Sequence, residues 1–349
     1  MKQEIKVLVV DDSAFMRHLI KDILDSTSNI KVIDFASNGS AALKKIKALK
    51  PDVVTLDIEM PILDGLKTLE RINKECPTPT IILSNLTRKS TDTTIKALMQ
   101  LGAIDFLQKP VGVIKGEDIE RIQTEIVEKI KLAVDVKSNP TKIEKTTIEV
   151  IKTNNLLRNT KARVVVIGAS TGGPKALEII VRFFPEDFPV PILIVQHMPP
   201  KFTTSLAHRL NSYSLLKIKE ARDGDQLEPG FGFLAPGDYH MILDKNNTIK
   251  LNKDPPVCGV RPSIDKTLFS VNEVYEGKIL GVILTGMGHD GTEGIEKIKE
   301  KGGMCIAEDK STCTVYGMPR SVIEANLADS VVPLQDIVPE IFNILSKWR

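Results

Sequence analysis

The amino-acid sequence predicts an α/β protein with two doubly wound domains, each built on a parallel β-sheet. Short apolar runs alternate with helical patterns in both halves of the chain, and a polar stretch at residues 131–162 separates the halves. Strands that alternate with helices form parallel sheets covered by helices on both faces. The 349 residues fit two domains at roughly 150 residues each. We expect the domains at residues 1–130 and 163–349.

Residues 1–130 contain five apolar runs that predict strands. They are IKVLVV, KVIDFA, DVVTL, TIILS and AIDFL, in chain order. Between them, apolar residues recur at spacings of three and four, which is typical of amphipathic helices. Pro51 and Gly102 each end one of these helical patterns just before a strand. The helices are expected over SAFMRHLIKDILD, SAALKKIKALK, DGLKTLERINKE and TDTTIKALMQLG.

Residues 131–162 are expected to form a linker between the two domains. The stretch has no Gly and no aromatic residue, and it carries 7 basic and 3 acidic side chains. Its apolar residues are too sparse to build a core of their own. Helical structure is expected only in its first turns. The chain's net charge of +2 is therefore the sum of a basic linker and two domains whose charges are nearly balanced.

The alternating pattern resumes after the linker. The runs RVVVIG, PILIVQ, KILGVILTG and GGMCIAED predict strands, and a helical pattern follows each of them. A longer segment, GFGFLAPGDYHMILDKNNTIKLN, lies between the second and third runs. Its two alternating runs flank Lys245-Asn246-Asn247, which is typical of a β-hairpin. The second domain is therefore expected to carry a β-hairpin insertion.

The composition excludes several classes of protein. A net charge of +2 provides no global field that would attract nucleic acid or a membrane surface. No run of about 18 apolar residues is present, and the start MKQEIKVLVVDD turns acidic, so we expect a cytoplasmic protein without membrane insertion. The four cysteines form no C-x-x-C pair, which argues against a disulfide framework and a zinc site.

Acidic residues collect at the predicted carboxyl ends of the first sheet. Asp11 and Asp12 follow the first strand, and Asp57 follows the third, with Glu59 shortly after it. Carboxylates that meet at one sheet edge repel each other unless a cation lies among them, and oxygen ligands suit Mg²⁺. Lys109 at the end of the fifth strand adds a positive charge. One such Asp is more often a helix cap, but the combination favours a functional site.

This half of the chain resembles the receiver domains of response regulators. The resemblance rests on VVDDS, LDIEMPILDG, Ser84, Phe106 and Lys109-Pro110, and it covers residues 5 to about 125. It implies a flavodoxin-like fold in which Asp57 accepts a phosphoryl group from a histidine kinase. Ser84, Phe106 and Lys109 would be the switch residues that respond to phosphorylation. The Mg²⁺ ligands that it implies are Asp12, Asp57 and the main-chain carbonyl of Glu59, with Asp11 bound through water.

Ser170 lies at a predicted strand-to-helix turn in the second half, between RVVVIG and KALEIIVRFF. Main-chain N–H groups at a helix N-terminus favour developing negative charge, although a serine there is by itself more often a cap. The next strand is followed by His197, and neighbouring strand ends bring this candidate base close to Ser170. The loop lacks the G-x-S-x-G pattern of α/β-hydrolases, and Pro174 occupies the lysine position of a P-loop.

The segment TGMGHDG, residues 285–291, leaves two alternatives open. It matches G-x-G-x-x-G, and Glu308 and Asp309 follow about 20 residues later, as in dinucleotide-binding domains. Against this interpretation, Asp290 would place a carboxylate inside the pyrophosphate loop. The other use of Asp290 is to accept a hydrogen bond from His197 and hold its tautomer, which would complete a Ser–His–Asp set.

The second half of the chain resembles the catalytic domain of the CheB family, the chemotaxis protein-glutamate methylesterases. GASTGG, QHMPP, APGDYHM, VRPSIDK, LTGMGHDG and AEDKSTCTVYGMPRS carry the resemblance. It implies a Rossmann-like domain in which Ser170 is the nucleophile, His197 the base and Asp290 the orienting acid. The oxyanion site would be the N–H of Met287, with Thr171 as a helper near Ser170.

Two histidines within these motifs receive no catalytic assignment. His289 precedes Asp290 at a position where we expect Asn or another small polar residue in relatives. It could compete as a proton acceptor, but we expect it on the surface or behind the site. His240, within APGDYHM, is expected to be a packed, hydrogen-bonded residue at the mouth of the site.

Together the two resemblances imply a hydrolase that is regulated by phosphorylation. Its reaction would be the hydrolysis of glutamate methyl esters, and the deamidation of selected glutamines, on methyl-accepting chemoreceptors. The unphosphorylated receiver is expected to cover the active-site edge, so phosphorylation would raise activity. A receiver fused to a dinucleotide-binding module is the alternative. A DNA-binding regulator is disfavoured, because residues 163–349 are net −2 and lack a short basic helix at the C-terminus.

Overall fold

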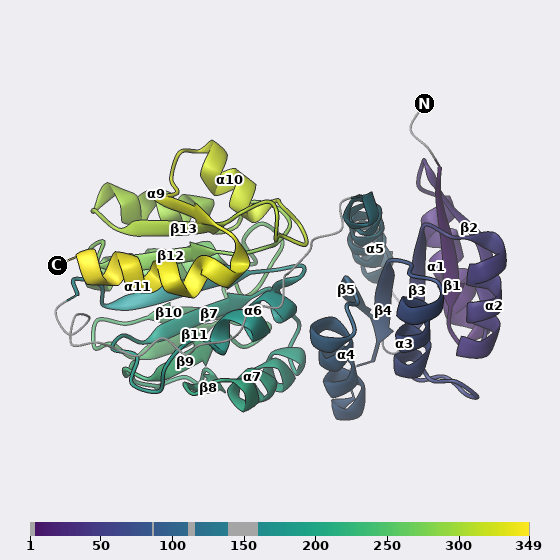
Figure 1. The fold of residues 1–349 in the computed structure, drawn as a ribbon, viewed down its shortest axis with the longest axis horizontal. Coiled ribbons are helices and arrows are strands. Elements are labelled where there is room, and N and C mark those ends of the chain that lie inside the picture. The colour runs from purple at the N-terminus through teal and green to yellow at the C-terminus, as the bar shows by residue number, and fades with distance from the viewer. Residues whose placement is uncertain (1–3, 86, 111–115, 139–159, 349) are drawn as a thin grey trace. The chain divides into compact units, whose positions relative to one another are not determined.

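The computed structural model describes residues 4–85, 87–110, 116–138 and 160–348 (Figure 1). The chain divides into two compact units, residues 1–140 and 141–349, and each unit is described by itself. Each unit contains a parallel β-sheet with α-helices packed around it, which confirms the predicted fold class. None of the helices in the described ranges combines the length and apolarity needed to cross a membrane.

The first unit contains a five-stranded parallel sheet of order β2-β1-β3-β4-β5. The strands β3 and β4 are buried throughout, as expected of central strands covered on both faces. Because β1 and β3 are neighbours, the loops that follow them meet at one edge of the sheet. The strands are β1 (Ile5–Val10), β2 (Ile30–Ala36), β3 (Val53–Asp57), β4 (Thr80–Ser84) and β5 (Asp105–Gln108).

Side-chain caps begin the first four helices of this unit. In each helix, the residue before the first turn accepts a hydrogen bond from a main-chain N–H three residues later. These caps satisfy N–H groups that have no partner within the helix. The N-cap residues are Ser13, Asn38, Asp64 and Thr87. The helices are α1 (Ala14–Asp25), α2 (Gly39–Leu49), α3 (Gly65–Glu75), α4 (Arg88–Gln100) and α5 (Gly116–Ser138).

The helix α5 continues eight residues past the expected domain boundary at residue 130. Ile126, Ile130 and Ala133 are buried in the core of the first unit, so the apolar spacing of three and four runs on into the expected linker. Residues 139–159 lie outside the described residues. At the far end of the expected linker, the Lys161 N–H donates to the carbonyl of Trp348 at 2.8 Å. The first turns of the expected linker are therefore helical, as expected, and belong to a helix that packs on the first unit.

The second unit contains a seven-stranded parallel sheet of order β14-β13-β12-β6-β7-β9-β8. The sequence patterns predicted β6, β7, β12 and β13, but not β9, which lies in the segment assigned to the hairpin insertion, nor the short edge strands β8 and β14. Only one of the four residues of β8, and none of the three of β14, is fully buried, so neither shows a continuous apolar run. The strands are β6 (Val164–Ala169), β7 (Ile192–Gln196), β8 (Lys217–Glu220), β9 (Phe231–Leu234), β12 (Ile279–Ile283), β13 (Met304–Glu308) and β14 (Ser330–Val332).

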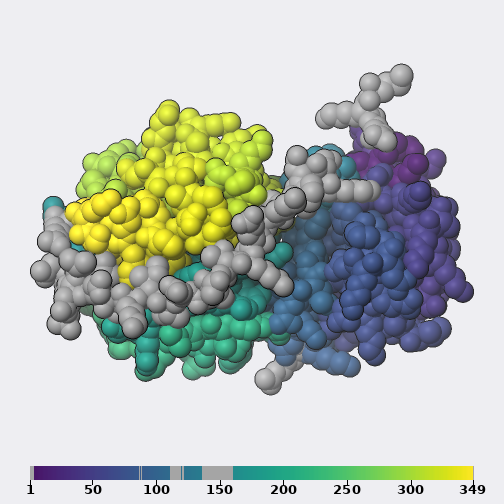
Figure 2. Space-filling model, in the orientation of Figure 1, coloured from purple at the N-terminus to yellow at the C-terminus, as the bar shows by residue number. Residues whose placement is uncertain are grey.

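The expected β-hairpin is present as a separate two-stranded antiparallel sheet formed by β10 (His240–Leu243) and β11 (Ile249–Asn252). It packs against α8, where Thr267 Oγ1 donates to the carbonyl of Met241 at 2.7 Å. The yellow C-terminal helix α11 lies on the surface of the second unit (Figure 2). The helices are α6 (Gly173–Val181), α7 (Phe202–Tyr213), α8 (Ile264–Tyr275), α9 (Thr292–Glu300), α10 (Met318–Glu324), the 3₁₀ helix η2 (Leu334–Asp336) and α11 (Ile337–Lys347).

Candidate functional sites

The first candidate site lies at the carboxyl ends of β1 and β3. Val10 pairs with Leu56 in the sheet, so Asp11 and Asp57, the next residues, stand at the same level on neighbouring strands. Asp12 completes the group, and ligand oxygens of the three carboxylates lie within 4.8 Å of one another. An all-oxygen donor set of this size fits a small divalent cation such as Mg²⁺. The side chain of Glu59 is exposed, so its expected contribution is limited to the main chain.

Lys109 joins two of these carboxylates. Its Nζ lies 2.7 Å from Asp11 Oδ2 and 2.9 Å from Asp57 Oδ2, and all three side chains are buried. Burial raises the pKa of Asp57 to about 6, and the charge and hydrogen bond of Lys109 limit the rise. The Asp57 carboxyl group is thus held in a nearly dry position, next to the buried ammonium group of Lys109.

The two other expected switch residues are also buried. Ser84 Oγ lies 2.9 Å from Ser90 Oγ and accepts from Thr94 Oγ1 at 2.7 Å, so its hydroxyl is held by two hydroxyls of α4. Phe106 is 5% exposed, and the ammonium group of Lys129 lies 5.6 Å from its ring centre. The sequence analysis did not identify Ser90 and Thr94. Their spacing of four residues on a helix was the available signal.

The second candidate site lies at the carboxyl ends of β6 and β7. Ala169 pairs with Gln196, so Ser170 and His197 are the next residues on two neighbouring strands. The side-chain amide of the buried Gln196 donates to the carbonyls of Ser170 at 2.9 Å and of His197 at 3.2 Å. Gly173 leaves room for this amide, because a Cβ there would lie 2.0 Å from Gln196 Oε1. The main chains that carry Ser170 and His197 are therefore fixed to each other.

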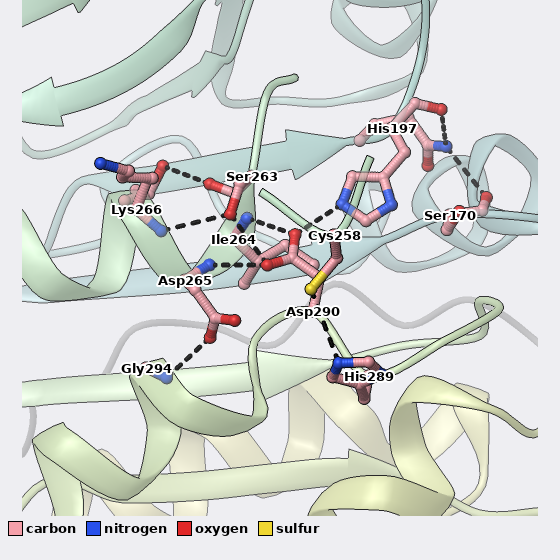
Figure 3. A network of polar contacts seen from close by, with 12 residues as sticks. Ser170, His197, Cys258, Ser263, Ile264, Asp265, Lys266, His289, Asp290 and Gly294 are labelled. Atoms are coloured by element: carbon pink, nitrogen blue, oxygen red, sulfur yellow. Dashed lines mark hydrogen bonds and ion pairs between the residues drawn. The ribbon is translucent and has the colours of Figure 1, made fainter. Parts of the chain in front are cut away.

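The structure brings His197 and Asp290 into direct contact. His197 Nε2 lies 2.8 Å from Asp290 Oδ2. Because an ionised carboxylate only accepts hydrogen bonds, Nε2 carries the proton and Nδ1 is left as an acceptor. The ring of His197 lies between Asp290 and Ser170 in Figure 3. The Ser170 hydroxyl has no hydrogen-bond partner within the described ranges of the chain.

The carboxylate of Asp290 is held by the N-terminus of α8. Oδ1 accepts from Ser263 Oγ at 2.8 Å and from the Asp265 N–H at 3.1 Å, and Oδ2 accepts from the Ile264 N–H at 2.7 Å (Figure 3). Burial opposes ionisation of Asp290, but the hydrogen bond and charge of His197 and the two N–H groups outweigh it and lower the pKa to about 2. Asp290 is therefore an anion at neutral pH.

Asp265 is a buried carboxyl group that the sequence analysis did not assign. Its Oδ1 accepts from the N–H of Gly294 in the first turn of α9 at 2.7 Å. Burial, together with the charge of the neighbouring Asp290, raises the pKa of Asp265 to about 7. At neutral pH the pair thus consists of an ionised Asp290 and an Asp265 whose ionisation is opposed by burial and by that charge. Ser263 and Asp265 lie in the run VRPSIDK, which is one of the motifs that carry the resemblance to the CheB family. Their spacing alone predicts no role for either residue.

The expected oxyanion residues lie beside Ser170. The Ser170 N–H donates to the carbonyl of Thr285 at 3.0 Å, which places the 285–287 loop next to the serine. Gly286 is needed for this approach, because a Cβ there would lie 2.8 Å from the Cβ of Ser170. The Met287 N–H donates no hydrogen bond within the described chain, and Thr171 is buried. A free N–H at this position fits an oxyanion donor.

The histidine of this loop, His289, does not belong to the group formed by His197 and Asp290. His289 is exposed, and its Nε2 lies 3.5 Å from the sulfur of Cys258. It forms no hydrogen bond with His197 in the part of the chain that the structure describes. His289 thus lies at the surface, as expected.

The dinucleotide interpretation of residues 285–291 is not favoured by this geometry. The carboxylate of Asp290 accepts hydrogen bonds from the donors at the start of α8. Asp290 belongs to the loop where a pyrophosphate would have to bind, and its negative charge would repel that group.

Comparison with known proteins identifies the family. Residues 165–341 match the family model described as CheB methylesterase, and residues 7–119 match that of the response regulator receiver domain. The chain is 46% identical over 344 residues to the protein-glutamate methylesterase/protein-glutamine glutaminase of Thermotoga maritima, with 98% of both chains covered. It is 45% identical over 342 residues to the same-named protein of Pyrococcus horikoshii, with 97% of this chain and 92% of that one covered.

A solved structure supports the same assignment. The crystal structure of the CheB methylesterase catalytic domain of Thermotoga maritima is 50% identical, with a TM-score of 0.51, and the match covers 52% of this chain and 98% of that one. The parallel sheet with Ser170, His197 and Asp290 at its carboxyl edge lies within the matched family region. The chain therefore belongs to the CheB methylesterase family and carries a response-regulator receiver domain ahead of the methylesterase domain.

Proposed function

We propose that the chain hydrolyses glutamate methyl esters on the cytoplasmic part of methyl-accepting chemoreceptors, with Ser170, His197 and Asp290 as the catalytic residues. The observation that carries the proposal is the 2.8 Å contact between His197 and Asp290 next to the end of β6, where Ser170 lies. Such a set activates a serine hydroxyl, which is otherwise a weak nucleophile.

Acylation begins when Ser170 Oγ attacks the γ-carbonyl carbon of the ester and its proton passes to Nδ1 of His197. Asp290 stabilises the imidazolium that forms and holds the ring through Nε2. The Met287 N–H binds the oxyanion of the tetrahedral intermediate, and Thr171 assists beside it. His197 then returns the proton to the methoxy oxygen, and methanol leaves.

Deacylation repeats these steps with water. His197 removes a proton from the water, whose oxygen attacks the acyl carbon, and Ser170 leaves with the proton, which frees a glutamate side chain. A glutamine side chain would react in the same way, with ammonia as the leaving group in place of methanol. Deamidation of receptor glutamines is therefore part of the proposal.

The receiver unit would regulate this reaction. An oxygen of Asp57 attacks the phosphorus atom of a phosphohistidine on a chemotaxis histidine kinase, the P–N bond breaks, the kinase histidine leaves, and an aspartyl phosphate forms. Asp12, Asp57 and the main-chain carbonyl of Glu59, with Asp11 through water, would hold a Mg²⁺ ion, which would neutralise the negative charge of the phosphoryl group. Phosphorylation then raises the rate of ester hydrolysis through the switch residues Ser84, Phe106 and Lys109.

The experiment is the release of methanol from methylated receptor membranes. Ser170→Ala is expected to abolish release, whereas Ser212→Ala, on the exposed end of α7, is the matched control. Normal release by Ser170→Ala would refute the catalytic assignment. For regulation, a small phosphodonor is expected to stimulate the wild type but not Asp57→Asn. Equal stimulation of both proteins would refute the proposed switch.

A further inference from the structure

His240 is a fully buried histidine that the proposed reaction does not use. It is the first residue of β10, and both of its ring nitrogens are engaged. Nδ1 lies 3.2 Å from the main-chain nitrogen of Ser263, and Nε2 lies 3.2 Å from the carbonyl oxygen of Pro255. The ring therefore connects the hairpin to the start of α8 and to the loop before it.

These contacts define the tautomer of His240. The Ser263 N–H only donates, so Nδ1 accepts, and the single ring proton is on Nε2, which donates to Pro255. Burial is the main reason why the pKa of His240 lies below its usual value. The hydrogen bond to the Pro255 carbonyl opposes this shift, the charges of Lys266 on α8 and of Arg261 in the preceding loop add to it, and the charge of Asp254 opposes it. The ring is therefore neutral.

The N–H held by His240 belongs to the residue that begins the cradle of Asp290. Ser263 donates its hydroxyl to Asp290, and the next two residues, Ile264 and Asp265, donate their N–H groups to the same carboxylate. Three donors on three consecutive residues move together with the main chain of Ser263. A shift there would turn the carboxylate relative to His197.

We propose that His240 is a positioning residue for the ester hydrolysis: Nδ1 fixes the main chain of Ser263, and through it the donors that aim Asp290 at His197. The inference rests on the proposed function, because Asp290 matters only if His197 is the base. Within the described residues His240 forms no hydrogen bond with Ser170 or His197.

Three substitutions separate the two hydrogen bonds of His240. In His240→Asn, the side-chain oxygen takes the place of Nδ1 and accepts from Ser263. In His240→Gln, the side-chain nitrogen takes the place of Nε2 and donates to Pro255, while the Ser263 N–H loses its acceptor. His240→Leu removes both hydrogen bonds. We expect Asn to keep kcat within about threefold of wild type, and Gln and Leu to lower it about tenfold or more with little change in KM.

A second measurement does not depend on activity. The proton between His197 Nε2 and Asp290 is expected to give a downfield ¹H NMR resonance in the full-length protein, assigned by its absence in His197→Gln. The resonance is expected in wild type and His240→Asn, and shifted or lost in His240→Gln and His240→Leu. Far-UV circular dichroism checks the fold, and if Leu does not fold, the comparison of Asn with Gln still decides.

The outcomes distinguish this inference from the proposed function. Equal kcat values and equal resonances for His240→Asn and His240→Gln would overturn the positioning role, even if Ser170→Ala is inactive. Active Ser170→Ala together with a resonance that follows the expected order would refute the proposed catalysis, while the link from His240 to Asp290 would stand.

Discussion

Replacing Asp290 by Asn tests the electrostatic part of the proposed mechanism. The substitution keeps the size of the side chain and one oxygen, so one of the two orientations of the amide still accepts from Ile264 and His197. It removes the negative charge in both orientations. The buried side chains of His197 and Asp290 are in contact at 2.8 Å, which places the centres of charge about 4 Å apart.

The size of the effect follows from that separation. At an effective dielectric constant of about 20, two unit charges about 4 Å apart interact by about 4 kcal/mol. The interaction is realised only when His197 becomes an imidazolium, so its loss raises the barrier and not the free energy of substrate binding. At about 1.4 kcal/mol per tenfold change, Asp290→Asn is expected to lower kcat about 10³-fold and to leave KM nearly unchanged.

Methanol release, measured across a range of ester concentrations, gives both kinetic constants for this variant. The matched control is Glu296→Gln, which removes one carboxylate from the exposed side of the neighbouring helix α9. A kcat for Asp290→Asn within tenfold of wild type, or a loss no larger than that of the control, would show that the charge of Asp290 does not stabilise the transition state.

Three further predictions concern single positions. Gly286→Ala is expected to reduce the rate of hydrolysis more than tenfold and the free energy of unfolding by about 1–3 kcal/mol, because the new Cβ would lie 2.8 Å from Ser170 Cβ. Methanol release measures the rate, and thermal unfolding measures the stability. An unchanged rate and an unchanged stability would contradict the close packing of Gly286 against Ser170. Asp265→Asn is expected to raise stability at pH 8 by on the order of 2 kcal/mol. The pKa of Asp265 in the folded protein, about 7, lies above the usual 3.8, so the stability of the wild type falls as the pH rises between these two values. Urea unfolding at pH 5 and at pH 8 measures how much Asp265→Asn gains at each pH. An equal gain at both pH values would contradict the raised pKa of Asp265. In the presence of a chelator, an NMR titration of Asp57 is expected to have its midpoint near pH 6. Mg²⁺ is expected to lower this midpoint, because a nearby cation favours the ionised carboxylate. A midpoint that does not respond to Mg²⁺ would exclude Asp57 as a ligand.

Three of the residues that the sequence predicts for the two sites share one property, which is their place at the end of a buried strand. Asp57, Ser170 and His197 all follow or end apolar runs that the patterns located correctly. Parallel topology then brings such strand ends to one edge, whatever the length of chain between them. The fold class and the expected site residues both depend on this rule.

The elements that were missed lack that signal. The edge strands β8 and β14 expose one or both faces and have no continuous apolar run. The helix α5 continues into a stretch whose composition is typical of a linker, and only the spacing of Ile126, Ile130 and Ala133 shows that it still contributes to the core. For residues 131–138 the average composition predicts a linker, whereas the apolar periodicity predicts a helix, and the structure agrees with the periodicity.

The support of Asp290 could not be predicted from strand ends, because it comes from a helix that lies earlier in the chain. A carboxylate as buried as Asp290 is ionised only where several donors converge, and the strand end that carries it supplies none of the three found here. The N-terminus of α8 supplies them, at the point where its N–H groups have no partners within the helix. The start of α8 therefore holds the carboxylate that contacts His197, and in the proposed mechanism His197 depends on the charge of that carboxylate. Substitutions far from Ser170 in the sequence can thus affect catalysis through this helix start without touching the substrate.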